Sequence, residues 1–123
     1  MIFDHMGIAV RDPAKSKEFY VKALAPLGIK VVMEGHGWTG MGREGKPQFW
    51  FGLDDELSGP NHIAFTAKDR AQVRGFHAAA LAAGGTDNGA PGLRPDYHPN
   101  YYGAFVLDPD GHNVEAVCHL PEA

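Results

Sequence analysis

An internal repeat relates the two halves of this 123-residue chain. When the sequence is shifted by about 57 positions, residues of the first half meet identical residues of the second half without a gap. The identical pairs are His5 and His62, Asp12 and Asp69, Phe19 and Phe76, Ala23 and Ala80, Leu24 and Leu81, and Gly28 and Gly85. A repeated unit of this size buries its apolar face against its neighbour. We therefore expect one domain of two modules, at about residues 1–57 and 58–123.

Each module predicts a strand, then a helix, then further strands. Residues 3–10 and 62–67 are short, apolar and partly alternating, which is typical of strands. Asp12 and Asp69 are good N-caps for helices whose apolar residues recur at helical spacing. Later strands are expected at residues 29–35, 37–42, 48–53, 101–107 and 112–118. Residues 84–100 are rich in Gly and Pro and predict a long loop with at most one short strand. The expected fold class is α+β, a curved mixed sheet with the helices outside.

Composition excludes several function classes. The formal net charge is −4 and the basic residues form no run, which argues against nucleic-acid binding. The single cysteine, Cys118, has no partner for an internal disulfide and suits a reducing compartment. The apolar stretches are shorter than the roughly 20 residues of a membrane helix, and the N-terminus lacks a secretory pattern. We expect a cytoplasmic protein with a small-molecule partner and no membrane or nucleic-acid partner.

Strand periodicity places His5 and His62 at equivalent positions, on the faces of their strands that point away from the helices. Glu115 lies in an apolar strand, where an unpaired charge is costly. A metal shared with both histidines would satisfy this carboxylate; pairing with Arg94 or another cation is the alternative. His77, on a helix, and His112, after a turn, are interpreted as solvated.

Residues 4–10, 61–65 and 102–115 resemble the vicinal oxygen chelate superfamily, which includes glyoxalases, fosfomycin- and bleomycin-resistance proteins and extradiol dioxygenases. The resemblance implies paired βαβββ modules, a homodimer, and a concave site for a divalent metal (zinc, manganese, nickel or iron). It also implies that His5, His62 and Glu115 are the metal ligands and that Glu115 is catalytic. Three protein ligands leave open positions for a substrate, as in catalytic metal sites.

Departures from the family pattern narrow the expected activity. Residues 48–53 contain no acid, which argues against lactoylglutathione lyase activity, and Gly7 stands where fosfomycin thiol transferases carry Thr. The resulting hypothesis is a glyoxalase-like metal-dependent lyase, isomerase or transferase whose small substrate chelates the metal through oxygens. The alternatives are a fosfomycin-resistance-like thiol transferase, an extradiol-dioxygenase-like enzyme, an inactive member, or a bleomycin-resistance-type binding protein without turnover. The aromatic residues that would line a binding groove are Phe49, Phe51, Trp38 and Trp50.

Two residues near the second module's loops are candidate substrate contacts, Tyr102 and Arg94. If the hairpin turn has four residues, 108–111, Tyr102 faces the same side as Glu115. Cys118 faces the opposite side by parity, which argues against a nucleophilic role.

Overall fold

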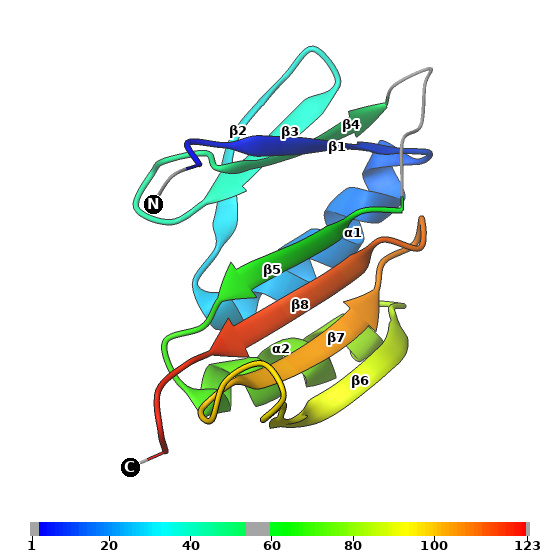
Figure 1. The fold of residues 1–123 in the computed structure, drawn as a ribbon. Coiled ribbons are helices and arrows are strands. Elements are labelled where there is room, and N and C mark those ends of the chain that lie inside the picture. The colour runs from blue at the N-terminus through cyan, green and yellow to red at the C-terminus, as the bar shows by residue number, and fades with distance from the viewer. Residues whose placement is uncertain (1–2, 54–59, 123) are drawn as a thin grey trace.

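The computed structural model describes residues 3–53 and 60–122, which form two modules with the same strand order. The sheets run β1-β4-β3-β2 and β5-β8-β7-β6 (Figure 1), which confirms the βαβββ modules. The described strands form two separate four-stranded sheets rather than one continuous sheet. The expected module boundary lies among residues 54–59, outside the described residues. The elements are β1 (Met6–Val10), α1 (Pro13–Leu24), η1 (Ala25–Leu27), β2 (Lys30–Gly35), β3 (Trp38–Gly42), β4 (Phe49–Leu53), β5 (His62–Thr66), α2 (Arg70–Ala82), β6 (Thr86–Leu93), β7 (Tyr102–Leu107) and β8 (Asn113–Cys118).

Both helices begin at the aspartates that the sequence predicts as N-caps. The Asp12 carboxylate accepts a hydrogen bond from the Lys15 backbone N–H at 3.2 Å. The Asp69 carboxylate accepts one from the Gln72 N–H at 2.8 Å. These bonds satisfy backbone donors that the first turn of a helix leaves free. No helix in the described part of the chain is long and apolar enough to span a membrane.

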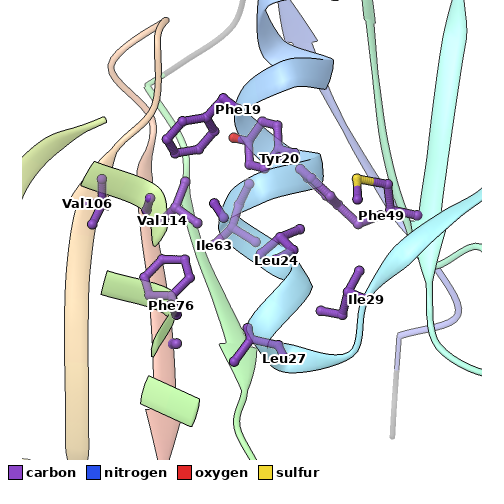
Figure 2. Packing of buried hydrophobic residues seen from close by; sticks show 14 of the residues in the cluster. Phe19, Tyr20, Leu24, Leu27, Ile29, Phe49, Ile63, Phe76, Val106 and Val114 are labelled. Atoms are coloured by element: carbon purple, nitrogen blue, oxygen red, sulfur yellow. The ribbon is translucent and has the colours of Figure 1, made fainter. Parts of the chain in front are cut away.

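Helix α1 lies in the core shared by the modules. Figure 2 shows Phe19 on the side of α1 toward Val106 and Val114, and Tyr20 on the side toward Phe49. Helices α1 and α2 also contact each other. This shared apolar core holds the two modules in a fixed relation.

The segment expected as a long loop contains an eight-residue strand, β6. This strand is at the edge of its sheet, where Pro91 removes no hydrogen bond that a second neighbour would need. Its pairing with β7 shifts register on both sides of Gly89, whose φ is +155°. These irregularities obscure the alternation that would identify a strand in the sequence. The expectation of a long loop with at most one short strand therefore understates the length of this strand, which spans residues 86–93.

The turn between β7 and β8 is anchored in the first module. Asp108 accepts a hydrogen bond from the Tyr20 phenol at 2.5 Å, and both side chains are buried. Asp110 accepts one from the backbone N–H of Arg11 at 3.1 Å. The turn therefore joins the modules through polar contacts as well as the apolar core.

His112, at the end of this turn, is also buried, with 3% of its surface exposed. Its Nε2 lies 3.2 Å from the carbonyl oxygen of Ala9, and its Nδ1 accepts the N–H of Asn61 at 2.9 Å. The interpretation of His112 as solvated is therefore wrong. His77 is mostly covered as well, and its Nε2 lies 3.0 Å from the Asp87 carboxylate.

Candidate functional site

His62 and Glu115 contact each other on neighbouring parallel strands. The register pairs Ala64 of β5 with Glu115 of β8, which brings His62 beside the same carboxylate. The distance from His62 Nε2 to Glu115 Oε1 is 2.7 Å. Glu115 is 1% exposed, whereas the His62 side chain is 56% exposed. A buried carboxylate therefore lies beside a solvent-accessible imidazole.

Tyr101 binds the second oxygen of this carboxylate. Its phenol donates a hydrogen bond to Glu115 Oε2. Burial raises the pKa of the Tyr101 phenol above its usual range, and the hydrogen bond and negative charge of Glu115 raise it further. The phenol therefore keeps its proton and remains a donor toward Glu115.

No lysine or arginine pairs with Glu115 in the part of the chain that the structure describes. The alternative that Arg94 is its ion-pair partner is therefore wrong for these residues. Burying a carboxylate is costly unless its charge is offset, and a metal cation bound beside Glu115 would offset that cost. One imidazole nitrogen and one carboxylate oxygen are also donors that divalent transition metals accept. The His62–Glu115 pair fits a metal on both grounds.

The structure places Tyr102 on the wrong face for a contact at this site. Strands β7 and β8 pair Leu107 with Asn113, so the connecting turn is five residues, 108–112, rather than four. Tyr102 is paired with Cys118, facing away from Glu115, and its ring lies 5.0 Å from the Arg70 guanidinium. Cys118 is buried on that opposite face, as expected. A five-residue turn places Tyr101, rather than Tyr102, on the same face as Glu115, so assuming a turn of that length would have predicted Tyr101 as the contact.

Arg94 lies on the face that carries Glu115. Its backbone N–H donates to the Tyr101 carbonyl at 2.7 Å, one position beyond the paired residues Leu93 and Tyr102. Opposed residues of an antiparallel pair project to the same face, so Arg94 and Tyr101 share a face. The Arg94 guanidinium carbon is 5.4 Å from the centre of the Phe105 ring.

His5 belongs to the other module and does not meet His62 and Glu115 within one chain. Its Nδ1 lies 2.7 Å from Asp4 Oδ1, and its side chain is 61% exposed. Over residues 3–53 and 60–122, no three His, Cys, Asp or Glu side chains are close enough to hold a metal together. One chain therefore brings together two of the three expected ligands.

A cleft of about 190 Å³ opens between the modules near His5. Its walls are mainly apolar and include Phe49, Ile63 and Phe65. Phe49 and Phe65 are in edge-to-face contact, with ring centres 5.2 Å apart. Neither His62 nor Glu115 lines this cleft, although Ala64 and Thr66, which alternate with Ile63 and Phe65 along β5, do.

In the first module, Trp50 takes the position that Glu115 takes in the second. Strand pairing sets Gly7 opposite Trp50 and Ala64 opposite Glu115, and the repeat relates Gly7 to Ala64. The absence of an acid from residues 48–53 therefore corresponds to a tryptophan at the equivalent place in the sheet.

Two tryptophans lie flat against glycines on the face of the first sheet opposite the core. A Cβ on Gly40 would come within 2.9 Å of the Trp50 ring, and one on Gly52 within 2.4 Å of the Trp38 ring. Only glycine permits these close approaches. Of the aromatic residues proposed to line a groove, Phe51 belongs to the buried core, whereas Phe49 belongs to the core and also lines the cleft near His5.

Comparisons with known proteins agree with this architecture. The family model for the Glyoxalase/Bleomycin resistance protein/Dioxygenase superfamily matches residues 2–116. A crystal structure of a glyoxalase/bleomycin resistance protein from Albidiferax ferrireducens T118 is 28% identical with a TM-score of 0.85, covering 96% of this chain and 99% of that chain. A glyoxalase/bleomycin resistance protein/dioxygenase family enzyme from Burkholderia phytofirmans PsJN is 21% identical with a TM-score of 0.74, covering 95% and 98%. No curated protein matches the chain.

Proposed function

Because the chain belongs to the glyoxalase/bleomycin resistance protein/dioxygenase superfamily, we propose that it is a metal-dependent enzyme of glyoxalase type. Its substrate is a small molecule that binds the metal through two oxygens. The observation that carries this proposal is the buried Glu115 carboxylate, which contacts His62 and has no lysine or arginine partner among the described residues. His62 and Glu115 are two of the metal ligands.

The third ligand in this proposal is His5 from a second copy of the chain. Three observations support it: His5 is exposed, it immediately precedes β1 of the other sheet, and no described trio of donors exists within one chain. The strands that lead from His5 and carry His62, β1 and β5, are the outer strands of their sheets. Neither strand has a second neighbouring strand among the described residues, so each has an edge with which another chain could pair. The functional unit is thus a homodimer with sites between the copies.

The metal, when bound, supplies a Lewis acid that stabilises negative charge on a substrate oxygen. The protein supplies the ligands and their orientation. Tyr101 holds Glu115 through its second oxygen, so the first oxygen keeps a fixed position beside His62. Of the two equivalent sheet positions, the first module has Trp50 and only the second module has a carboxylate. We therefore assign the acid–base role at this site to Glu115.

Metal content measured by mass spectrometry tests the proposal. We expect the untagged protein, supplied with zinc, manganese, nickel or iron(II), to retain about one metal ion per chain. His62→Ala and Glu115→Gln should each weaken metal binding about tenfold or more, because the first removes a donor nitrogen and the second removes the negative charge of the carboxylate. His36→Asn is the control, since His36 has a φ of +55°, which Asn tolerates, and lies outside the site. Equal metal content in all four proteins would overturn the proposal.

A second candidate is a binding protein that sequesters a planar aromatic ligand without turnover. The half-buried indoles of Trp38 and Trp50, which lie flat on one face of the first sheet, favour it. The same experiment separates the two functions. A protein that retains none of the four metals, yet shows quenching of its tryptophan fluorescence by a planar aromatic ligand, would be the binding protein.

A further inference from the structure

Arg94 lies on the face that carries the His62–Glu115 pair, and it has no acidic partner among the residues that the structure describes. The described ion pairs engage other basic residues, among them Arg11, Arg70 and Arg74, and none of these pairs includes Arg94. The described acceptors of the Arg94 guanidinium are backbone oxygens, that of Ala90 at 2.8 Å and that of Leu93 at 3.5 Å. A guanidinium has five N–H donors, so most of them have no acceptor over residues 3–53 and 60–122.

The surrounding strand fixes this guanidinium on the surface of the sheet. A Cβ on Gly92 would lie 3.1 Å from one terminal nitrogen of Arg94, and a Cβ on Gly89 would lie 3.3 Å from the other. The two glycines therefore leave the space in which the guanidinium rests. The Phe105 ring supports it by a cation–π contact. Because the side chain is already held in place, binding a ligand costs it little further conformational entropy.

Phe105 also connects Arg94 with the metal-ligand pair. Its ring centre is 6.3 Å from that of His62, while the guanidinium carbon is 5.4 Å from the same ring. A small molecule that binds a metal at His62 and Glu115 with one end and Arg94 with the other would therefore lie beside Phe105. The ring gives an apolar floor for its carbon atoms, and Arg94 gives a positive charge at the far end.

We propose that Arg94 binds an anionic group of the substrate, so that the site selects small molecules carrying a carboxylate in addition to their two chelating oxygens. This inference rests on the proposed function of the His62–Glu115 site. A guanidinium recognises a carboxylate through two parallel N–H···O bonds, and such charge-assisted bonds are stronger than neutral ones.

Two chelating probes of matched length test this selection by isothermal titration calorimetry on the zinc-loaded protein. Butanohydroxamic acid binds a metal through two oxygens and ends in a methyl group. Succinic acid monohydroxamic acid has the same chelating group and carbon number but ends in a carboxylate. We expect the carboxylated probe to bind about tenfold more tightly, which matches one charge-assisted interaction.

Three variants assign the preference to Arg94. In Arg94→Gln the two probes should bind equally, with the affinity of butanohydroxamic acid unchanged. Arg94→Lys keeps the charge but loses the planar fork, so the preference should fall to a few-fold. Lys30→Gln removes one positive charge from exposed β2 in the other module and should preserve the full preference.

The outcomes distinguish a failure of the Arg94 assignment from a failure of the proposed metal-dependent function. If butanohydroxamic acid binds but the carboxylated probe binds no better, the role of Arg94 is wrong and the metal site stands. If the preference survives in Arg94→Gln, another group recognises the carboxylate and the assignment is likewise wrong. If neither probe binds the zinc-loaded protein, the proposed function fails and the inference fails with it.

Discussion

Tyr20 joins the two modules through one hydrogen bond between buried side chains. Its phenol donates to Asp108 at 2.5 Å, and its ring packs at 5.0 Å from Phe49. Burial raises the pKa of Tyr20 well above its usual value, and the charge of Asp108 and the hydrogen bond raise it further. The folded protein therefore keeps this proton at pH values where an unfolded tyrosine, with a pKa of about 10, loses it.

This difference makes stability depend on alkaline pH. Because the folded pKa is raised, the stabilisation is fully present below pH of about 10 and is lost as pH rises beyond it. Tyr20→Phe should lower the free energy of unfolding by about 1–2 kcal/mol at pH 8, because it removes the bond to Asp108. The gap between this variant and the wild type should narrow at higher pH. Urea unfolding at pH 8 and pH 10.5 measures both effects.

Tyr97→Phe is the matched control, because Tyr97 is 69% exposed. It should follow the wild type at both pH values. An equal gap between Tyr20→Phe and the wild type at pH 8 and at pH 10.5 would contradict the titration argument.

Single residues of the site could be predicted where the alternation of side chains along one strand alone decides which face of the sheet they occupy. His62 and Glu115 were predicted from alternation, and the structure brings them into contact. Tyr101 was missed because parity across a hairpin depends on the length of its turn. The Asp108 carboxylate accepts the backbone N–H groups of Asp110 and His112, which closes a five-residue turn. One additional residue exchanges the faces of Tyr101 and Tyr102.

At the scale of an element, helix α2 depends on the cap at its first turn. Asp69→Ala should lower the free energy of unfolding by about 1 kcal/mol, because the Gln72 N–H loses its acceptor. Asp69→Asn keeps an acceptor oxygen and should cost markedly less. Urea unfolding at neutral pH measures both variants. Equal losses would show that the charge of Asp69, rather than its hydrogen bond, stabilises α2.

The helices and most strands were predictable from periodicity and caps, whereas β6 was not. Its residues include Gly89, Pro91 and Gly92, which are unfavourable in a strand with two neighbours. At a sheet edge the tertiary pairing with β7 outweighs that propensity.

At the scale of the whole molecule, the proposed dimer makes a prediction about mixed chains. His5→Ala and His62→Ala should each abolish tight metal binding when expressed alone. When the two variants are co-expressed, a mixed dimer has one site that lacks both histidines and one site that is intact. Random pairing should therefore restore about a quarter of the wild-type sites, as the two-fold symmetry of such a dimer requires. Metal content of the co-purified protein, compared with a mixture made after purification, measures this restoration.

No restoration in the co-expressed protein would place all three ligands in one chain or remove His5 from the set. The repeat predicted the two modules, but it could not predict that His5 and His62 lie apart within one chain. Parity assigns a side chain to one face of its own sheet. The relation between two sheets depends on the packing of α1 and α2, which local sequence patterns do not specify.

Because of Trp50, the two sheets of the repeat carry different side chains at equivalent positions. The two sheets share one strand order, yet equivalent positions carry an indole in one and a carboxylate in the other. In the proposed dimer, a ligand that enters between an apolar wall and an acidic wall has only one favourable orientation. Such a cavity distinguishes the two ends of an asymmetric molecule, and with a third contact at Arg94 it distinguishes mirror images.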